Sequence, residues 1–361
     1  MDRRAHHRGA RAALEVTGSV TDGRRRVRRP SDAVILPVVL LLLIAAIGIS
    51  IAVGPRTLTF DELFSALAAP TGTEADLIVR DVRLPRTFIG VAAGSALAVA
   101  GVIMQTLTRN PLAEPGLLGV NAGASLAVAV AIVVLGIGDF GSTMWFAFAG
   151  AAIASALVAL IGGVGRGASI GRLALTGVAV AAVLSAATAA LSLIDPASYQ
   201  AMRLWGAGAL GGRSLEAATL TLIVIAGGLL LVVAIAPGIG LLALGEDTAR
   251  ALGGRVGAVR IGGFIAIAVL CGAATAAAGP IAFVGLLVPH ALRAVFGPDT
   301  RRLLIYSVLA GPILLLFADV LGGVLIAPRS IPVGVVTAFL GAPVLVALVL
   351  SRRVQADGAP S

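Results

Sequence analysis

Hydrophobic residues occur along the chain in long continuous runs that are separated by short polar segments. Most runs are about 20 residues long, the length that an α-helix needs to cross a bilayer. They lack the alternation that marks the strands of a membrane β-barrel. The pattern therefore predicts an all-α polytopic membrane protein. Its ten expected spans cover residues 34–53, 84–107, 117–137, 144–163, 173–194, 215–236, 259–278, 281–295, 303–323 and 333–350.

Proline and glycine interrupt some of these runs. Gly279-Pro280 separates the runs 259–278 and 281–295, and Pro289 lies near the end of the second run. The two runs are therefore either two spans or one tilted, broken helix. Breaks at membrane depth are tolerated where protein or a water-filled cavity covers the backbone. We accordingly expect short or broken helices, which transporters commonly use.

The composition agrees with a membrane protein and excludes several kinds of chemistry. Hydrophobic residues make up 58% of the chain, charged residues only 12%, and the mean hydropathy is +1.02, whereas soluble domains carry about 25% charged residues. All 27 basic residues are arginine, so the lysine-containing phosphate loop of a conventional ATPase is excluded. Cys271 and the one histidine outside the N-terminal tail, His290, are too few for a metal cluster. We expect no metal, cofactor or catalytic residue on this chain.

The distribution of arginine predicts the orientation in the membrane. Nine arginines precede residue 30, and a cytoplasmic N-terminus places 20 of the 27 inside and seven outside. Because cytoplasmic loops are enriched in arginine and lysine, both termini are expected in the cytoplasm. The expected organisation is a disordered Arg-rich cytoplasmic tail over residues 1–32, a transmembrane domain over 33–352 and a short cytoplasmic tail over 353–361.

The segment Arg80–Arg86 precedes the second expected span on the external side. Arg83 and Arg86 are three residues apart and would share one helix face. One interpretation is that their side chains reach the lipid headgroups. The other is a docking surface for an acidic partner, because arginine at a helix N-terminus opposes the helix dipole. A short amphipathic stretch over residues 60–68 lies in the same external region.

Two cytoplasmic segments are also candidates. Prolines and a glycine in residues 109–116 predict a rigid turn, for which a purely structural role is favoured. Residues 237–260 form the longest internal polar segment and contain a short amphipathic helix that ends at a glycine. That helix either lies on the membrane surface or binds in a groove of a soluble partner.

Asp319 lies deep in the ninth expected span. A carboxylate at the centre of a span costs about 2.5–3.5 kcal/mol on insertion scales, so it is a functional candidate. It is either a proton-relay group or a hydrogen-bond acceptor near a helix end. A relay needs a chain of titratable groups, and Asp319 is the only one that we find there, which favours the second interpretation.

Several strings of residues together resemble one family. They are Arg83-Leu-Pro-Arg86, Ala100–Gln105, Asn110–Gly119, Gly245–Gly253, Phe283–His290, Ala318-Asp319, Ile331–Thr337 and Leu340–Pro343. In this order they resemble the permease subunits of ABC importers for ferric siderophores, haem and vitamin B12, which are type II importers of the FecCD type. The resemblance runs from about Arg83 to Leu350.

The resemblance implies a transporter subunit in the inner or plasma membrane rather than an enzyme. A second permease subunit, identical or similar, would complete the pathway. Two ATP-binding subunits would hold ATP and Mg, and an extracytoplasmic substrate-binding protein would deliver the cargo. The expected cargo is an iron(III)-siderophore complex, with haem or cobalamin as alternatives. Nucleic acid is not an expected partner.

The resemblance also implies roles for individual residues. Arg83 and Arg86 would dock the binding protein. The family commonly has a further arginine and a glutamate at the positions of Gly323 and Ser330, and Arg329 is our expected substitute. The ATPase-coupling residues would be Gly245, Glu246, Asp247, Arg250, Leu252 and Gly253. The structural or gating residues would be Asn110, Pro111, Glu114, Pro115, Gly116, Pro289, His290 and Asp319.

The implied mechanism is alternating access, in which ATP binding on the partner subunits switches the side to which a central cavity opens. The competing interpretation is a secondary transporter driven by an ion gradient, with Asp319 as the titrating group. A membrane-embedded enzyme is disfavoured, because the sequence contains no nucleophile–base pair and no metal cluster.

Overall fold

The computed structural model describes residues 32–54, 56–162, 170–194, 196–326 and 329–357, and every regular element within these ranges is helical. The α-helices of the described residues are α2 (Asp32–Ala52), α3 (Phe60–Ala68), α4 (Glu74–Leu77), α5 (Leu84–Leu107), α6 (Val120–Ala129), α7 (Phe140–Gly162), α8 (Ile170–Ser192), α9 (Pro196–Gly206), α10 (Leu215–Ala243), α11 (Glu246–Ala251), α12 (Val256–Ala278), α13 (Val284–Phe296), α14 (Thr300–Leu325) and α15 (Val333–Asp357). Three further turns are the π-helical η1 (Ile78–Arg83) and η3 (Val130–Val134) and the 3₁₀-helical η2 (Pro115–Leu118).

The helices confirm the expected fold class. Among the described residues, eight helices are long and apolar enough to cross a membrane, and two shorter apolar helices, Val120–Val134 and Val284–Phe296, occupy the third and eighth expected runs. The runs 259–278 and 281–295, which could have been two spans or one broken helix, form two helices, α12 and α13, separated at Gly279. Two expected ends are too early. Helix α10 continues through Pro237 to Ala243, so the polar cytoplasmic segment is shorter than expected, and α15 continues past residue 350.

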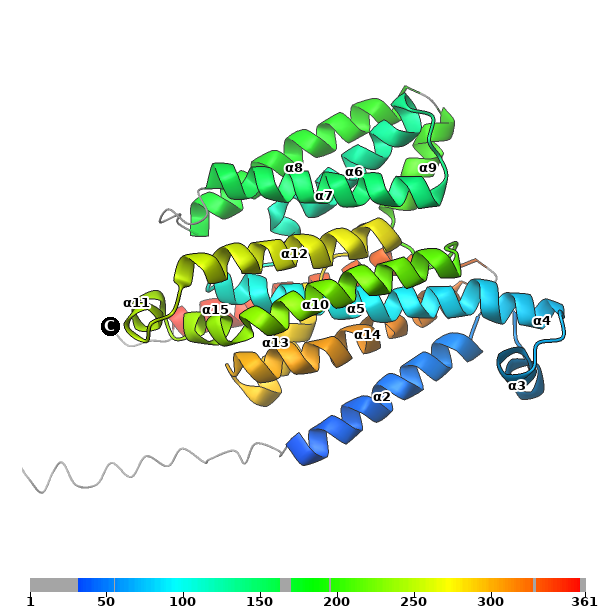
Figure 1. The fold of residues 1–361 in the computed structure, drawn as a ribbon, viewed down its shortest axis with the longest axis horizontal. Coiled ribbons are helices and arrows are strands. Elements are labelled where there is room, and N and C mark those ends of the chain that lie inside the picture. Colours follow the sequence, from blue (N-terminus) through cyan, green and yellow to red (C-terminus); the bar gives the residue numbers. More distant parts are fainter. Residues whose placement is uncertain (1–31, 55, 163–169, 195, 327–328, 358–361) are drawn as a thin grey trace, which may run out of the picture. The chain divides into compact units, whose positions relative to one another are not determined.

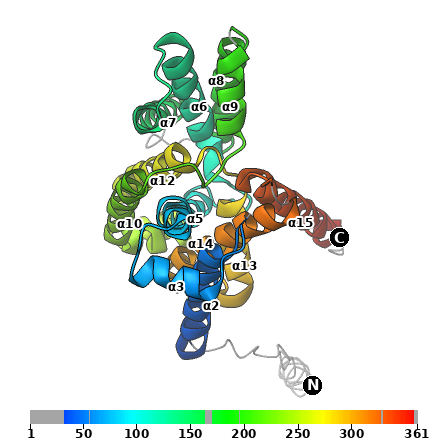
Figure 2. The ribbon, with the colours of Figure 1, turned by 90° about the vertical axis from the view of Figure 1, so that its right-hand side faces the viewer.

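Helix α5 lies at the centre of the bundle, surrounded by α10, α12, α13 and α14 (Figure 2). Together with α4 and η1 it forms a continuous helical segment of 34 residues, Glu74–Leu107, whose most apolar window is 89% buried. The corresponding value for α2 is 6%. The second span is therefore the core of the bundle, whereas α2 is peripheral.

Glycine allows the neighbours of α5 to approach closely. A Cβ atom on Gly101 would lie 2.0 Å from the carbonyl oxygen of Gly285 in α13. A Cβ atom on Gly311 of α14 would lie 2.1 Å from the carbonyl oxygen of Gly94. Small residues at such crossings let backbones pack directly, which matters in lipid because burial of apolar surface gives little drive for helix association.

Helices α6, α7 and α8 pack on one another as a second group (Figure 2). Gly123 of α6 and Gly150 of α7 meet at their crossing, where a Cβ on Gly150 would lie 2.3 Å from the carbonyl oxygen of Gly123. Helix α7 also packs against α12 and joins this group to the helices around α5. The same close packing through glycine therefore recurs in both groups.

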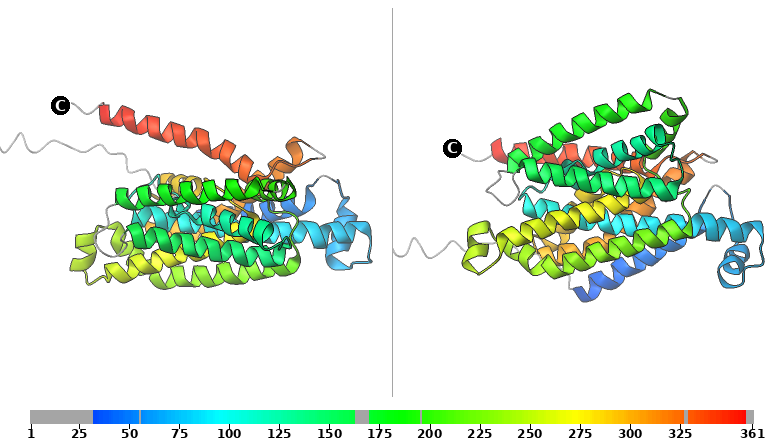
Figure 3. Two further views of the ribbon diagram at one scale, coloured as in Figure 1. Left: turned by 90° about the horizontal axis from the view of Figure 1, so that it is seen from above. Right: turned by 45° about the horizontal axis from the view of Figure 1, so that its top comes forward.

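The short helices lie at the ends of the bundle. Helix α11 lies at the end where α15 finishes, and α3 and α4 lie at the opposite end (Figures 1 and 3). The amphipathic stretch over residues 60–68 is helix α3, which begins with a capping box between Thr59 and Glu62. The expected tail over residues 1–32 lies outside the described residues except for Asp32, and α15 continues to Asp357, beyond the expected end of the membrane domain.

Candidate functional site

At the end of the bundle that carries α3, Arg86 and Asp319 form a buried ion pair between α5 and α14. The Arg86 Nε donates to Asp319 Oδ2 at 2.5 Å, and the two side chains are 20% and 5% exposed. A carboxylate inside a membrane protein is typically paired in this way. This partner is 233 positions away in the sequence.

Arg83, which the family resemblance implies as a docking residue, is buried within this chain. Its side chain is buried and donates to the backbone carbonyls of Ile51, Ala52 and Arg56, so it binds the last turn of α2 and the chain that follows. Arg83 and Arg86 therefore contact different helices, although they are three residues apart. The physical reason is that the last carbonyls of a helix have no partner within the helix, and Arg83 satisfies them.

Of the remaining external candidates, two are exposed and Gly323 is buried. Arg329 and Ser330 lie at the surface between α14 and α15. Gly323 is close to the ion pair, because a Cβ on it would lie 3.8 Å from Nη2 of Arg86. Of the three arginines expected to dock a binding protein, Arg329 is the accessible one and Arg86 is only partly so. The docking roles of Arg83, Arg86 and Arg329 all remain predictions.

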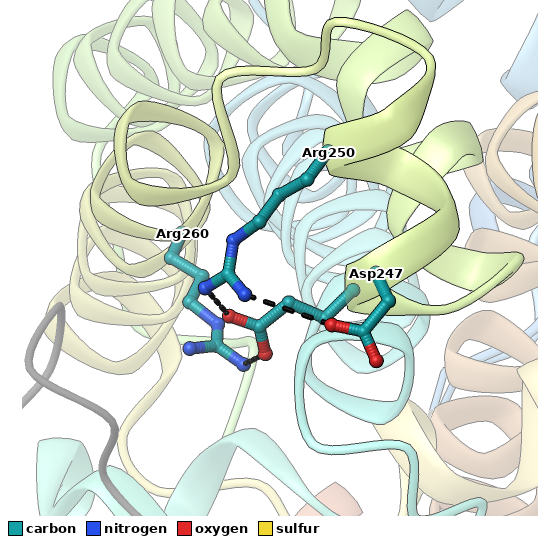
Figure 4. A network of polar contacts seen from close by, with 4 residues as sticks. Asp247, Arg250 and Arg260 are labelled. Carbon is teal, nitrogen blue, oxygen red and sulfur yellow. Dashed lines mark hydrogen bonds and ion pairs between the residues drawn. The ribbon is translucent and has the colours of Figure 1, made fainter.

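At the opposite end, helix α11 is held by a network of charges (Figure 4). Glu246 accepts from Arg250 of the same helix at 2.5 Å and from Arg260 of α12 at 2.9 Å. Arg250 also approaches Asp247 at 3.7 Å. Arg260 and Glu246 are 21% and 25% exposed, so this pair ties α11 to the first turns of α12.

The surface of α11 leaves several groups available to a partner. Asp247 and Leu252 are exposed, and Ala249 is the buried residue of the helix. Gly245 precedes the helix with φ +117°, and Gly253 follows it with φ +80°. These two glycines permit the sharp turns that isolate α11 from α10 and α12. The amphipathic helix with its C-terminal glycine is thus confirmed.

The turn between α5 and α6 is also well defined. The Asn110 side chain accepts from the backbone N–H of Leu112 at 3.0 Å, an Asx-type turn. Pro115 and Gly116 begin η2, and Glu114 precedes it with its Oε1 bonded to the backbone N–H of Phe283. The segment Asn110–Gly116 therefore contacts α13 instead of forming an isolated loop.

Pro289 and His290 lie within α13, and His290 lines the apolar space between α2, α13, α14 and α15. This space has a volume of about 890 Å³ and is lined almost entirely by aliphatic side chains. Cys271 is buried in α12. Within the described residues, no cluster of three or more histidine, cysteine or acidic side chains is arranged to hold a metal ion.

Known proteins are similar to this chain in sequence and in fold. A sequence model of the FecCD transport family matches residues 41–351. The chain belongs to the FecCD transport family. Among its relatives, the ferric enterobactin transport system permease protein FepD of Escherichia coli K12 is 47% identical over 330 residues, which cover 91% of this chain and 97% of FepD. The vitamin B12 import system permease protein BtuC of Citrobacter koseri is 38% identical, over 87% of this chain and 93% of BtuC.

A solved structure supports the fold of this FecCD chain. It is an inward-facing metal-chelate type ABC transporter, with a TM-score of 0.77 and 26% identity, and the match covers 88% of this chain and 99% of that one. These matches confirm the family to which the motifs pointed, and the eight long and two shorter apolar helices of the described residues agree with it. The FecCD chain is a multi-pass membrane permease.

Three polar contacts of this FecCD chain were not foreseen from its sequence. Gln105 of α5 donates to the carbonyl oxygen of Gly285 at 3.1 Å and accepts from Arg293 of α13. Thr275 of α12 donates to Asn121 of α6 at 2.9 Å. A polar side chain inside an apolar run was the available signal for each of these residues. The run itself does not identify the partner.

Proposed function

We propose that this chain is the permease subunit of an ATP-driven importer and that its cargo is an iron(III)-siderophore complex. Membership of the FecCD family carries this proposal. FepD, named for ferric enterobactin transport, supports the choice of cargo through its 47% identity over nearly the whole chain. BtuC and the hemin permease HmuU of Yersinia pestis, each 38% identical, make cobalamin and haem the alternatives.

The proposed complex contains two permease subunits, two ATP-binding subunits and an extracytoplasmic binding protein. The absence of lysine from this chain agrees with the proposal that the lysine-containing phosphate loop lies on a partner subunit. Helix α11 is the proposed contact with the ATP-binding subunit. It projects from one end of the bundle, is tied to α12 through Glu246, and presents exposed side chains.

The proposed mechanism is alternating access between the paired permeases. Closure of the ATP-binding subunits would move α11, and the pair between Glu246 and Arg260 would transmit that displacement to α12. Since α12 packs directly on α5, a rigid movement of α12 reaches the centre of the bundle. Closely packed helices shift as units because their interfaces do not deform continuously.

A gradient-driven carrier is the weaker candidate. Its titrating group would be Asp319, but Asp319 is bonded to the guanidinium of Arg86. A nearby positive charge favours the ionised carboxylate, so protonation in each cycle would first have to break this pair. The contact supports a structural role for Asp319.

The cargo is tested by uptake in cells that lack the gene and in the same cells carrying it. Radiolabelled ferric enterobactin, haem and cobalamin are offered separately. Gene-dependent accumulation of the ferric siderophore alone is the expected result. Accumulation of cobalamin or haem instead would reassign the cargo while keeping the importer.

The ATP-binding partner is tested through helix α11. The charge reversal Glu246→Arg removes both ion pairs and places three arginines together, so recovery of an ATPase with the purified permease should fall. Glu74→Arg is the matched control, because that carboxylate is 74% exposed and lies at the other end of the bundle. Equal recovery of the ATPase with both variants would refute the assignment of α11.

A further inference from the structure

The break between α12 and α13 contains a residue in a conformation that bulky side chains rarely adopt. Phe283 has φ +69° and ψ −19°, in the left-handed region. Among the described residues other than glycine, only Arg109 shares a positive φ. Such a conformation persists where surrounding contacts hold it, and it is often found at elements that switch.

Two contacts hold Phe283 in place. Its backbone N–H donates to Oε1 of Glu114 at 2.5 Å, although 169 positions separate the two residues. Its side chain lies against α15, where a Cβ on Gly341 would be 2.3 Å from Cγ of Phe283. Only glycine leaves room for the ring at this point. Phe283 therefore joins the α5–α6 turn to α15.

The same turn is packed onto the first residues of α13. A Cβ on Gly285 would lie 2.9 Å from Cδ of Pro115, and the carbonyl oxygen of Gly285 accepts from Gln105 at 3.1 Å. Glu114 thus contacts Phe283, which precedes α13, and Pro115 contacts Gly285, the second residue of α13. A displacement of the turn must displace the start of α13 or break the bond between Glu114 and Phe283.

The other end of this turn reaches helix α11. Arg109, the second residue with a left-handed backbone, begins the turn, and its Nη2 lies 4.0 Å from the position that a Cβ on Gly245 would occupy. Gly245 immediately precedes α11. The turn therefore begins near the residue that precedes α11, at Arg109, and leads along the chain to Glu114 and its bond to Phe283.

We propose that Glu114 is a positioning residue that locks the α12–α13 break in its left-handed form and releases it when α11 moves. The inference rests on the proposed function, since it assigns a device to the same transport cycle. A carboxylate at this depth must be hydrogen-bonded to be tolerated, and its charge strengthens the bond to the Phe283 N–H. Loss of that bond removes the contact that holds the strained residue and frees α13 to move relative to α15.

The first test measures uptake of a radiolabelled ferric siderophore with three variants. Glu114→Ala removes the acceptor and should lower uptake about tenfold or more, the loss expected for a buried bond to a charged group. Glu114→Gln retains an oxygen acceptor and should keep most of the uptake. The double variant Glu114→Ala/Phe283→Gly should recover part of the uptake, because glycine adopts the left-handed conformation without strain but lacks the ring that packs on α15. Glu74→Ala, an exposed carboxylate, is the control and should leave uptake unchanged.

The second test measures the distance between α13 and α15 in the assembled transporter. Cys271→Ser removes the only cysteine, and spin labels are placed at the exposed Val295 and Val349. Glu114→Ala should broaden the distance distribution, and Glu114→Gln should leave it narrow. Membrane abundance of each variant is measured in parallel, so loss of folding is recognised separately.

Three results would overturn the proposal. They are normal uptake with Glu114→Ala, a Glu114→Gln variant as defective as Glu114→Ala, and a distance distribution that Glu114→Ala leaves unchanged at normal abundance. Failure of the unaltered chain to take up any offered chelate would instead contradict the proposed function. The two failures are therefore distinguishable.

Discussion

At the scale of single residues, the role of the buried pair between Arg86 and Asp319 differs between the two candidate functions. The pair is structural in an ATP-driven importer, whereas Asp319 would gain and lose a proton in a gradient-driven carrier. If the pair is structural, removing either partner leaves an uncompensated charge inside the bundle, which costs about 3–5 kcal/mol. Removing both leaves no unpaired charge. The double substitution should therefore destabilise the chain less than the sum of the two single ones.

This prediction is measured by a double-mutant cycle on thermal unfolding in detergent, with Arg86→Leu, Asp319→Leu and both together. Arg329→Leu is the matched control, since its side chain is exposed and should have little effect on the midpoint. Strict additivity of the two single substitutions would mean that the pair contributes no coupling energy.

Arg83 shows what a single sequence leaves undetermined at this scale. Its position at the external mouth was predicted, but its partners were not, because the carbonyls of Ile51, Ala52 and Arg56 lie about thirty positions earlier. Periodicity gives the face of a helix on which a residue lies. It does not show which neighbouring helix end needs donors.

At the scale of elements, we predict that Arg83 stabilises the C-terminal end of α2. Replacing it with alanine leaves the C-terminal carbonyls of α2 without their donors, so hydrogen exchange over residues 50–58 should accelerate. Arg56→Ala is the control, because its pair with Glu74 is solvent-exposed and contributes little. Equal exchange in the Arg83→Ala variant and the unaltered chain would contradict the anchoring role.

Close packing around α5 gives a second prediction at this scale. Gly101→Ala places a Cβ 2.0 Å from the carbonyl oxygen of Gly285, and overpacking of this kind typically costs about 1–3 kcal/mol. The midpoint of thermal unfolding should fall by several degrees. Gly48→Ala in α2 adds the same methyl group with no atom within 4 Å, so its midpoint should not fall. A similar midpoint for both variants would refute the packing argument.

Most element boundaries could be predicted, because hydrophobic runs and glycine–proline pairs are local signals. The end of α10 could not: Pro237 suggested a break, yet the helix continues to Ala243. Within a membrane bundle, neighbouring helices can satisfy the carbonyl that a proline leaves unpaired. The left-handed Phe283 was also not predictable, since its stabilising partner Glu114 comes from another part of the chain.

At the scale of the whole molecule, the orientation in the membrane follows from the arginine count and from the ends at which α3 and α11 lie. In a Cys271→Ser background, Thr248→Cys on α11 should react with an impermeant thiol reagent only after the cells are opened. Thr57→Cys, beside α3, should react in intact cells, and both positions are exposed. The reverse pattern would invert the topology.

The central proposal for the whole molecule is that ATP on a partner subunit drives import through this helical FecCD chain. The decisive measurement is uptake of a radiolabelled ferric siderophore by cells with and without the gene, in the presence of a protonophore and with cellular ATP maintained. The account predicts that gene-dependent uptake persists under these conditions. Uptake that collapses with the proton gradient while ATP is unchanged would contradict it and restore Asp319 as a titrating group.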